Sequence, residues 1–241
     1  MRVVKVVLKG ITTSFRHPHF MWGRHPTYPM PPPATVFGHI CSALGYIPPP
    51  GSFQFGYRFK CAGRFVDLEW LYKVRAASPT EKKGGFTTVG EGDLVRRDVL
   101  FRPRLVLYIA RPDWLDAFRN PRYPVVLGRS QDLATYVSFE VVELQRSSAA
   151  YYEGTLLPFK LRPFIARGYA LYAPLYIDPI SREAVFRRFI VIADRIRVPS
   201  DDTQTIDGQF PLEEHWIDPN EPTDGDYGCG VWFWRLADGT S

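Results

Sequence analysis

The chain has 241 residues, of which 45% are apolar and 15% aromatic, enough for a packed core in one large domain or two small ones. No apolar run approaches the roughly 20 residues of a membrane span, and the start MRVVKVVLKG is too short and too interrupted by Lys for a secretory signal, so we expect a cytoplasmic protein with no membrane partner. Three widely separated cysteines indicate neither a disulfide framework nor a zinc site.

The net charge of +5 is unevenly distributed along the chain. Residues 1–200 hold 29 Lys and Arg against 15 Asp and Glu, whereas residues 201–241 hold one Arg against 10 acidic residues. Of the 30 basic residues 23 are Arg, whose planar guanidinium suits phosphates and stacked bases. This basic body favours a polyanionic partner, with nucleic acid as the leading candidate. A basic, solvated surface without such a partner is the alternative.

The first predicted elements are a strand and a helix. Four of the residues 3–8 are valine, a β-rich pattern that indicates a central strand. In TYPMPPPATVFGHICSALG the prolines exclude a helix before Ala34, Thr35 is the expected N-cap, and Gly45 is the expected left-handed residue after the helix. The expected buried face of this helix is Val36, Phe37, Ile40, Cys41 and Leu44, and the opposite face is Gly38, His39 and Ser42.

The loop between strand and helix, residues 12–28, mixes cations with aromatic side chains. Such a loop stacks bases and holds phosphates, or its aromatic side chains pin it to the core, and the sequence leaves both open. A metal site on His17 and His19 lacks an evident third ligand. The candidate RNA contacts in this loop are Arg16, His17, Arg24, His25 and Tyr28.

Two alternating runs follow the helix, residues 53–61 and 64–72, and the Ala62-Gly63 pair between them predicts a β-hairpin. Residues 73–102 are polar and Gly-rich, and a structureless loop of that length is uncommon in a compact domain. We therefore expect a protruding β-arm that orders on a partner. The cations of this arm are Arg75, Lys82, Lys83, Arg96, Arg97 and Arg102.

Further elements follow in the order of a known motif. Residues 105–110 predict a strand, residues 112–118 a short helix, and residues 135–144 a last core strand after a turn at Gly128. The order β-α-β-β-(arm)-β-α-β predicts an α+β fold with a ferredoxin-like, RRM-type core over residues 1–146. Residues 147–241 then form a small β-rich C-terminal region with an acidic end, including strands at 170–177 and 189–192.

Recognisable catalytic motifs are missing from the sequence. It holds no Walker motif, G-x-G-x-x-G, H-E-x-x-H or G-x-S-x-G, which disfavours the commonest nucleotide-dependent, metal and serine chemistries. We expect no cofactor, no metal and no catalytic residue.

Three features together resemble the fifth CRISPR-associated protein family of the RAMP superfamily, the Cascade subunit that caps the 5′ end of the guide RNA. They are the opening strand followed by TYPMPPPATVFGHICSALG, the long arm before RPRLVLYIA, and PVVLGRSQDLA before the last core strand. The resemblance covers residues 3 to about 145. Beyond that point the chain matches only in being β-rich.

The resemblance implies a subunit that binds the 5′ handle of a CRISPR RNA, contacts the backbone and large subunits of a type I Cascade complex, and meets target DNA through that complex. The arm would be the family's thumb, with Lys82, Lys83, Arg96 and Arg97 on it and Arg75 and Arg102 at its base. Gly128, Arg129 and Ser130 would form a turn that meets RNA phosphates. A salt bridge from Arg129 to Asp132 is the alternative for that arginine.

A non-catalytic RNA-binding subunit is thus the leading hypothesis. One branch of the same family is thought to cut CRISPR repeats without a metal, using a Tyr near the first helix and a Lys-His pair. Tyr46 fits the first role here, but no Lys-His dipeptide occurs. The metal-independent endoribonuclease is therefore the alternative, and an RNA-binding module outside CRISPR immunity is a third possibility.

Overall fold

The computed structural model describes residues 1–20, 23–72, 74–76, 86–88, 92–199 and 214–236. Within these residues the chain is a strand-rich α/β protein with few helices. The helices are α1 (Pro33–Leu44), α2 (Leu115–Arg119) and two short 3-10 turns, η1 (Pro112–Trp114) and η2 (Phe159–Phe164). None of the helices in the described part is long and apolar enough to cross a membrane.

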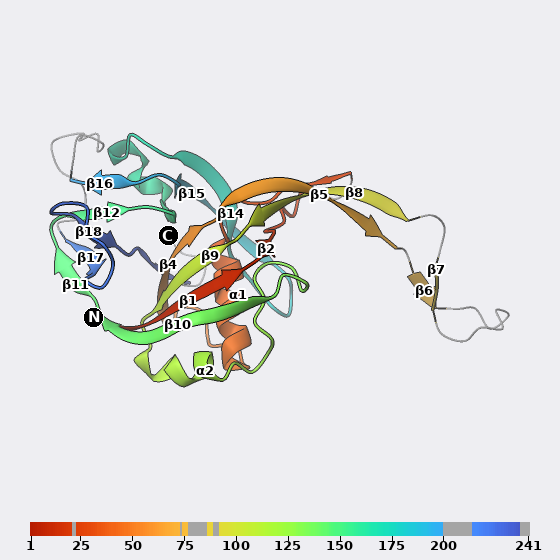
Figure 1. The fold of residues 1–241 in the computed structure, drawn as a ribbon, viewed down its shortest axis with the longest axis horizontal. Helices are drawn as coiled ribbons and strands as arrows, with labels where there is room; N and C mark the ends of the chain where they lie inside the picture. Colours follow the sequence, from red (N-terminus) through yellow and green to blue (C-terminus); the bar gives the residue numbers. More distant parts are fainter. Residues whose placement is uncertain (21–22, 73, 77–85, 89–91, 200–213, 237–241) are drawn as a thin grey trace.

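The first sheet is antiparallel and has the strand order β10-β1-β9-β4-β19 (Figure 1). β1 lies between two neighbours, which confirms the predicted central strand. Counting β1, β4, β9 and β10 as strands one to four, their order is 4-1-3-2, and α1 and α2 lie in the β1–β4 and β9–β10 connections. The strands are β1 (Arg2–Gly10), β4 (Gln54–Lys60), β9 (Arg104–Ile109), β10 (Ala134–Glu143) and β19 (Phe233–Arg235).

Helix α1 begins at Pro33, before the start expected at Thr35, because proline is well tolerated in the first helical turn. The predicted N-cap role of Thr35 is wrong: Pro32 is the N-cap, no side chain caps the helix, and the Thr35 N–H donates to the Pro32 carbonyl at 2.9 Å. The predicted end is confirmed, because Gly45 has φ of 79° and its N–H donates to the Cys41 carbonyl.

The buried face of α1 includes one residue that the periodicity placed on the opposite face. His39 is buried, its Nδ1 donates to the Val126 carbonyl at 3.1 Å, and the Tyr136 hydroxyl lies 2.9 Å from its Nε2. Burial lowers the pKa of His39 to about 4, although the hydrogen bond to Val126 opposes this. His39 is therefore a neutral core residue that joins α1 to β10, while Gly38 beside it stays exposed.

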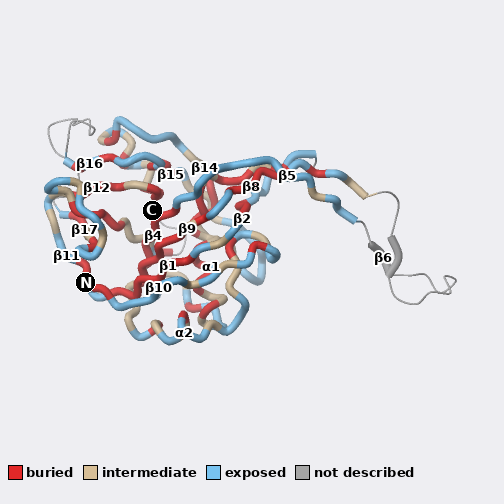
Figure 2. Tube along the Cα trace, viewed as in Figure 1, coloured by how far each residue is buried: buried red, intermediate tan, exposed pale blue. Residues whose placement is uncertain are grey.

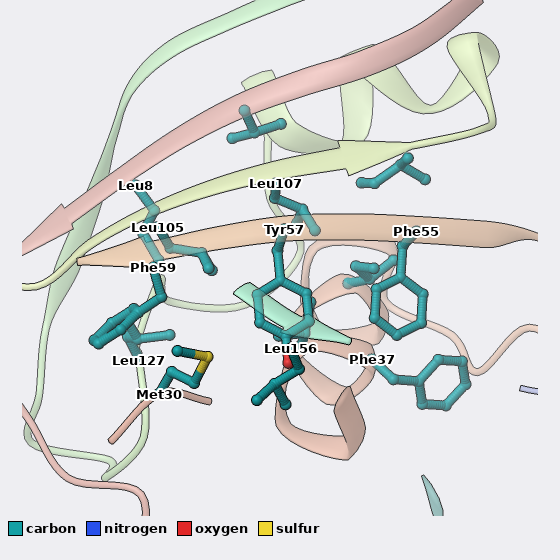
Figure 3. Close-up of a cluster of buried hydrophobic side chains, with 14 of the residues drawn as sticks. Leu8, Met30, Phe37, Phe55, Tyr57, Phe59, Leu105, Leu107, Leu127 and Leu156 are labelled. Atoms are coloured by element: carbon teal, nitrogen blue, oxygen red, sulfur yellow. The ribbon is translucent and has the colours of Figure 1, made fainter. Parts of the chain in front are cut away.

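One hydrophobic core lies between the first sheet and α1. Figure 3 shows Tyr57 and Phe55 pointing from the sheet into this core, with Phe37 of the helix beside Phe55. Leu156, from beyond the predicted domain boundary at residue 146, belongs to the same cluster. That boundary therefore does not separate two independent cores.

The predicted hairpin of residues 53–61 and 64–72 is wrong in its pairing. Both runs are strands, β4 and β5 (Gly63–Leu71), but β4 pairs with β9 and β5 pairs with β8 (Asp93–Phe101). The two strands separate because β4 buries side chains on both faces, whereas β5 is exposed along nearly its whole length. The chain leaves the first sheet at Ala62, whose N–H donates to the Phe101 carbonyl.

Strands β5 and β8 project from the body, and we call them, with β6 (Val74–Ala76) and β7 (Phe86–Thr88), the arm (Figure 1). Its pairing begins at Gly63 opposite Phe101, so the arm includes a strand that lies before the predicted span of 73–102. Two short strands add to β8 near the body, β2 (Thr12–Thr13) and β3 (Arg24–His25). Figure 2 shows β5 almost wholly exposed, whereas β8 is mostly buried towards the body.

The C-terminal region adds two sheets, and residues 170–177 and 189–192 are strands in it as predicted. One sheet has the order β11-β17-β18-β12-β16 and the other β13-β15-β14. Their strands are β11 (Gln145–Ser147), β12 (Ala150–Tyr152), β13 (Thr155–Pro158), β14 (Tyr169–Ile177), β15 (Ala184–Ile192), β16 (Ile196–Val198), β17 (His215–Asp218) and β18 (Gly228–Gly230).

A buried cluster of charges lies where the C-terminal region meets the sheet face opposite α1. Lys5 on β1 contacts Asp218 at 2.6 Å and Glu221 at 2.9 Å, and Arg58 on β4 contacts Glu221 at 3.1 Å. Burial alone would lower the pKa of the Lys5 amine, but its hydrogen bonds to Asp218 and Glu221 raise it above the usual value. Acidic residues of the C-terminal region thus neutralise two cations of the basic body.

Candidate nucleic-acid interface

The two strands of the arm define two faces. Residues directly opposite in an antiparallel pair point to the same side, and the register runs from Gly63 opposite Phe101 to Leu71 opposite Asp93. One side, which we call the Trp70 face, carries Arg64, Val66, Leu68, Trp70, Leu94, Arg96, Asp98 and Leu100. The other side, the Glu69 face, carries Gly63, Phe65, Asp67, Glu69, Leu71, Asp93, Val95, Arg97, Val99 and Phe101.

Exposed apolar side chains and arginines share the Trp70 face. Trp70 is 51% exposed, and Val66, Leu68 and Leu94 are exposed to a similar degree. Three exposed arginines share this face: Arg64 lies near the start of the pairing, and Arg96 with its neighbour Arg24 on β3 lies further along the arm.

Asp98 is the one carboxylate of the Trp70 face among the paired residues. It is buried and forms ion pairs with Arg24, at 3.4 Å, and with Arg64. One buried anion thus positions two guanidinium groups that remain half-exposed or more. The arrangement leaves excess positive charge on the same face as an exposed indole, the combination that binds phosphates and bases of single-stranded nucleic acid.

On the Glu69 face, Glu69 is the centre of an ionic network. The Glu69 carboxylate accepts a hydrogen bond from Arg97 Nε at 2.5 Å and forms a second ion pair with Arg129. Arg97 is buried and also donates from Nη2 to His25 Nδ1 at 2.9 Å. The predicted RNA contacts Arg97 and His25 are therefore interior residues that fix the arm to the body.

The predicted phosphate-binding turn at Gly128 is likewise packed against the protein. Gly128 has φ of 89°, and a Cβ there would lie 2.6 Å from both the Ser14 carbonyl and Thr13 Oγ1. Arg129 pairs with Asp132, and this hydrogen bond raises the pKa of the guanidinium above its usual value. The structure thus contains the salt bridge from Arg129 to Asp132, which was the alternative to a phosphate contact. Ser130 is exposed.

The loop before α1 divides its candidate residues between core and surface. Tyr28 is 1% exposed, and burial raises its pKa to about 12, so its ring is a core side chain and no platform for a base. His17 stacks on it with ring centroids 3.6 Å apart. Burial lowers the pKa of His17, and the charges of His19 and Arg64 lower it further. Arg16 is exposed.

Three of the predicted arm cations fall where the structure describes no side chain. Lys82 and Lys83 lie outside the described residues, and of Arg75 only its place in β6, opposite Thr87, is described. Arg102 is exposed in the turn between β8 and β9, with φ of 48° and its guanidinium 5.3 Å from the Phe101 ring.

Sequence reasoning missed two residues beside the candidate interface. Arg64 begins the second run of the predicted hairpin, and only the pairing of that run with β8 places it next to Asp98. Tyr169, at the start of β14, is half exposed; burial raises its pKa while the nearby charge of Arg64 opposes that shift. The C-terminal region held no motif that could have pointed to Tyr169.

Comparison with known proteins finds likeness in structure and none in sequence. No protein-family model and no curated protein matches the chain. A chain of a "CRISPR RNA-guided surveillance complex" superposes with a TM-score of 0.51 at 18% identity, covering 81% of this chain and 91% of that one. A chain of a "Type III-B Cmr-beta bound to cognate target RNA" gives a TM-score of 0.52 at 10% identity, covering 80% and 86%. At these identities the likeness shows a shared strand-rich α/β fold.

The described residues offer few groups for acid–base or metal chemistry. No cluster of three His, Cys, Asp or Glu side chains among them is placed to hold a metal ion. Tyr46 is exposed just after α1, but His39, the nearest histidine in sequence, is buried with both ring nitrogens in hydrogen bonds. His215 is buried as well, and burial lowers its pKa to about 4.

Proposed function

We propose that the chain is a non-catalytic, RNA-binding subunit of a CRISPR RNA-guided complex. The Trp70 face of the arm carries this proposal, because the exposed Arg24, Arg64 and Arg96 lie on the same face as the exposed Trp70. The likeness in fold to chains of two CRISPR effector complexes supports it, since one of those complexes is described as bound to target RNA.

In its finer form the proposal is a type I Cascade subunit with a ferredoxin-like, RRM-type core. The 4-1-3-2 strand order of β1, β4, β9 and β10 supports the core assignment. In this proposal the subunit binds the 5′ handle of the CRISPR RNA, contacts backbone and large subunits, and meets target DNA only through the assembled complex. The Pro-rich entry to α1 and the turn after Gly128 are the sequence features that favour this family.

The sheet face opposite α1 is a poor candidate for the RNA site. RRM domains bind bases on an open sheet face. Here that face is covered by apolar contacts that include Trp216 and Phe233, and its cations Lys5 and Arg58 are paired with Asp218 and Glu221. RNA is therefore expected on the arm and its base.

The absence of catalysis in this proposal rests on the state of the buried histidines. RNA cleavage to a cyclic phosphate needs a base for the 2′-hydroxyl and an acid for the leaving oxygen. His39 and His215 are neutral, buried and hydrogen-bonded, which favours a structural role for both. No specific observation favours the endoribonuclease alternative.

One experiment tests the proposal and its alternatives together. The chain is expressed with its neighbouring genes, purified, and the co-purifying RNA is sequenced; we expect CRISPR RNAs with a common 5′ handle and several larger partner proteins. The isolated chain is then incubated with labelled repeat RNA in EDTA. Discrete cleavage, lost in a His→Ala variant, would overturn the non-catalytic role, and capture of unrelated RNA without protein partners would favour a generic RNA-binding module.

A further inference from the structure

A row of three aromatic rings lies on the β14–β15 hairpin. Tyr172 and Phe186 stack with ring centroids 5.2 Å apart and planes inclined by 20°. The ring of His19, from the loop before α1, lies 5.6 Å from Phe186 at an inclination of 33°. The row therefore joins two segments that are far apart in the sequence.

The strand register explains why these rings are outside the core. Leu171 and Phe189 are directly opposite each other and pack into the core beneath α1. Tyr172 and its partner Arg188 are one position on, so they point to the other side of the hairpin. Tyr172 is 55% exposed and Arg188 is exposed, whereas Phe186 is half-buried between its neighbours.

The charges around the row favour an anionic partner. Arg188 is the direct cross-strand neighbour of Tyr172 and lies 5.8 Å from the Phe159 ring. The carboxylate of Asp178 is turned to the end of the hairpin, where it accepts hydrogen bonds from the N–H groups of Ile180 and Ser181. The exposed side of the row thus presents aromatic rings beside a cation.

The row is also connected to the arm. His19 lies two residues from His17, and the charge of Arg64 on the Trp70 face is close enough to lower the pKa of His17. Tyr169, on the same strand but on the side of the hairpin opposite Tyr172, is near Arg64 as well. The loop that carries His17 and His19 therefore links the neighbourhood of Arg64 to the row.

We propose that Tyr172, Phe186 and His19 form a stacking platform for an unpaired base of single-stranded RNA, with Arg188 contacting the adjacent phosphate. The inference rests on the proposed RNA-binding function and assigns a second contact area, built by the C-terminal region. Every base has an aromatic face, so the platform accepts any base and contributes affinity with little sequence preference. A phosphate on Arg188 supplies the electrostatic part of the contact.

Fluorescence of 2-aminopurine tests the platform directly. The probe is a single-stranded RNA carrying one 2-aminopurine, moved along the strand in successive oligonucleotides and titrated with the full chain. Stacking quenches 2-aminopurine, so we expect strong quenching at one position or two adjacent ones. Tyr172→Ala should abolish that quenching and weaken binding roughly 5- to 100-fold, the range expected for one lost base stack.

Two further variants separate stacking from bulk and from nonspecific effects. Tyr172→Phe keeps the aromatic face and should bind like the wild type, whereas Tyr172→Leu keeps apolar bulk alone and should resemble Tyr172→Ala. The matched control is Tyr123→Ala, which removes a tyrosine of nearly equal exposure, 54%, that also lies beside an arginine. The slope of log affinity against log salt should stay unchanged in Tyr172→Ala, because stacking releases no counterions. In Arg188→Ala this negative slope should become less steep by about 0.7, because one phosphate is no longer neutralised.

The outcomes distinguish this inference from the proposed function. If the wild type binds RNA in a salt-dependent way but Tyr172→Ala or Tyr172→Leu has the same RNA affinity as the control Tyr123→Ala, the stacking platform is overturned. The proposed RNA-binding function is not affected by that result. A Tyr172→Ala variant that binds RNA normally but no longer joins its protein partners overturns it in favour of a protein contact. No RNA binding by the wild type overturns both.

Discussion

Arg129 and Asp132 are joined by two parallel hydrogen bonds, Nε to Oδ2 at 2.8 Å and Nη2 to Oδ1 at 2.7 Å. The N–H of Arg129 donates to the same carboxylate at 3.2 Å, and Thr12 Oγ1 donates to it at 2.9 Å. Asp132 is buried, so this pair closes the turn against β2. The geometry of this ion pair gives Arg129 a structural role, which the sequence analysis offered only as an alternative to phosphate binding.

Arg129→Ala should therefore destabilise the fold and leave RNA affinity nearly unchanged. Removing one partner of a buried ion pair leaves the Asp132 charge uncompensated, and we expect the free energy of unfolding to fall by about 3 kcal/mol. Chemical denaturation and RNA titration measure the two effects. Arg119→Ala, which removes an exposed pair with Asp116, is the control and should cost less than about 1 kcal/mol. Weaker RNA binding at unchanged stability would restore the phosphate-contact interpretation.

Arg96→Ala should weaken RNA binding through the electrostatic term alone. Arg96 is exposed on the Trp70 face, so its loss should leave the melting temperature unchanged. The plot of log affinity against log salt has a negative slope, and for a single strand the loss of one neutralised phosphate makes this slope less steep by about 0.7. Titrations at several salt concentrations measure that slope. The same slope in wild type and variant would mean that this face does not contact RNA.

The buried His39 predicts a loss of stability in mild acid. Its pKa is about 4 in the folded chain, below the usual 6.5, so the unfolded chain binds the proton first as the pH falls. The stabilisation is fully present above pH 6.5 and is lost as the pH drops towards 4, by about 2 kcal/mol at pH 5. Denaturation curves between pH 4 and 8 measure this.

His39→Gln should reduce that pH dependence without abolishing it. Burial also lowers the pKa of His215 to about 4, so His215 supplies a slope of the same sign in the variant. We expect roughly half of the combined loss at pH 5 to remain. If the free energy of unfolding fell equally with pH in the wild type and in the variant, His39 would not be the neutral residue described above.

Asp218→Ala should destabilise the contact between the C-terminal region and the first sheet. Asp218 is buried against Lys5 and accepts a hydrogen bond from the Tyr108 hydroxyl at 2.8 Å. Its removal leaves the Lys5 amine with Glu221 as its remaining close partner, at a cost of roughly 3–5 kcal/mol. Urea denaturation checks this, with the exposed Asp116→Ala as the control. An unchanged midpoint would mean that the charge cluster is not rigidly formed.

The sequence predicted the elements of the fold better than their pairing. Runs of β-branched and apolar residues located β1, β9 and β10, and helical periodicity located α1, whose buried face repeats at the helix spacing. These patterns failed for the pairing of β4 and β5, since the Ala62-Gly63 pair is an equally good signal for a hairpin and for a chain that passes from one sheet to another. Only burial distinguishes the two, and burial depends on strands that arrive later in the chain.

The candidate site shows the same limit. Residue type identified the arginines of the arm, yet Arg96 and Arg97 are adjacent and lie on opposite faces, one exposed and the other enclosed by Glu69 and His25. Composition cannot tell such neighbours apart, because the partner that encloses Arg97 is on another strand. Nothing in the sequence indicated a role for Tyr172, because the role proposed here depends on its stacking with Phe186.

The last described strand also has a consequence for how the chain is made. β19 pairs with β4, so the first sheet is completed by residues 233–235 lying against residues 54–56. During synthesis at about 5–20 residues per second, that edge of β4 stays unpaired for roughly 10 to 35 s after it leaves the ribosome. An open edge invites pairing with another nascent chain. Expression with slow translation or without chaperones should therefore favour aggregation before any RNA is met.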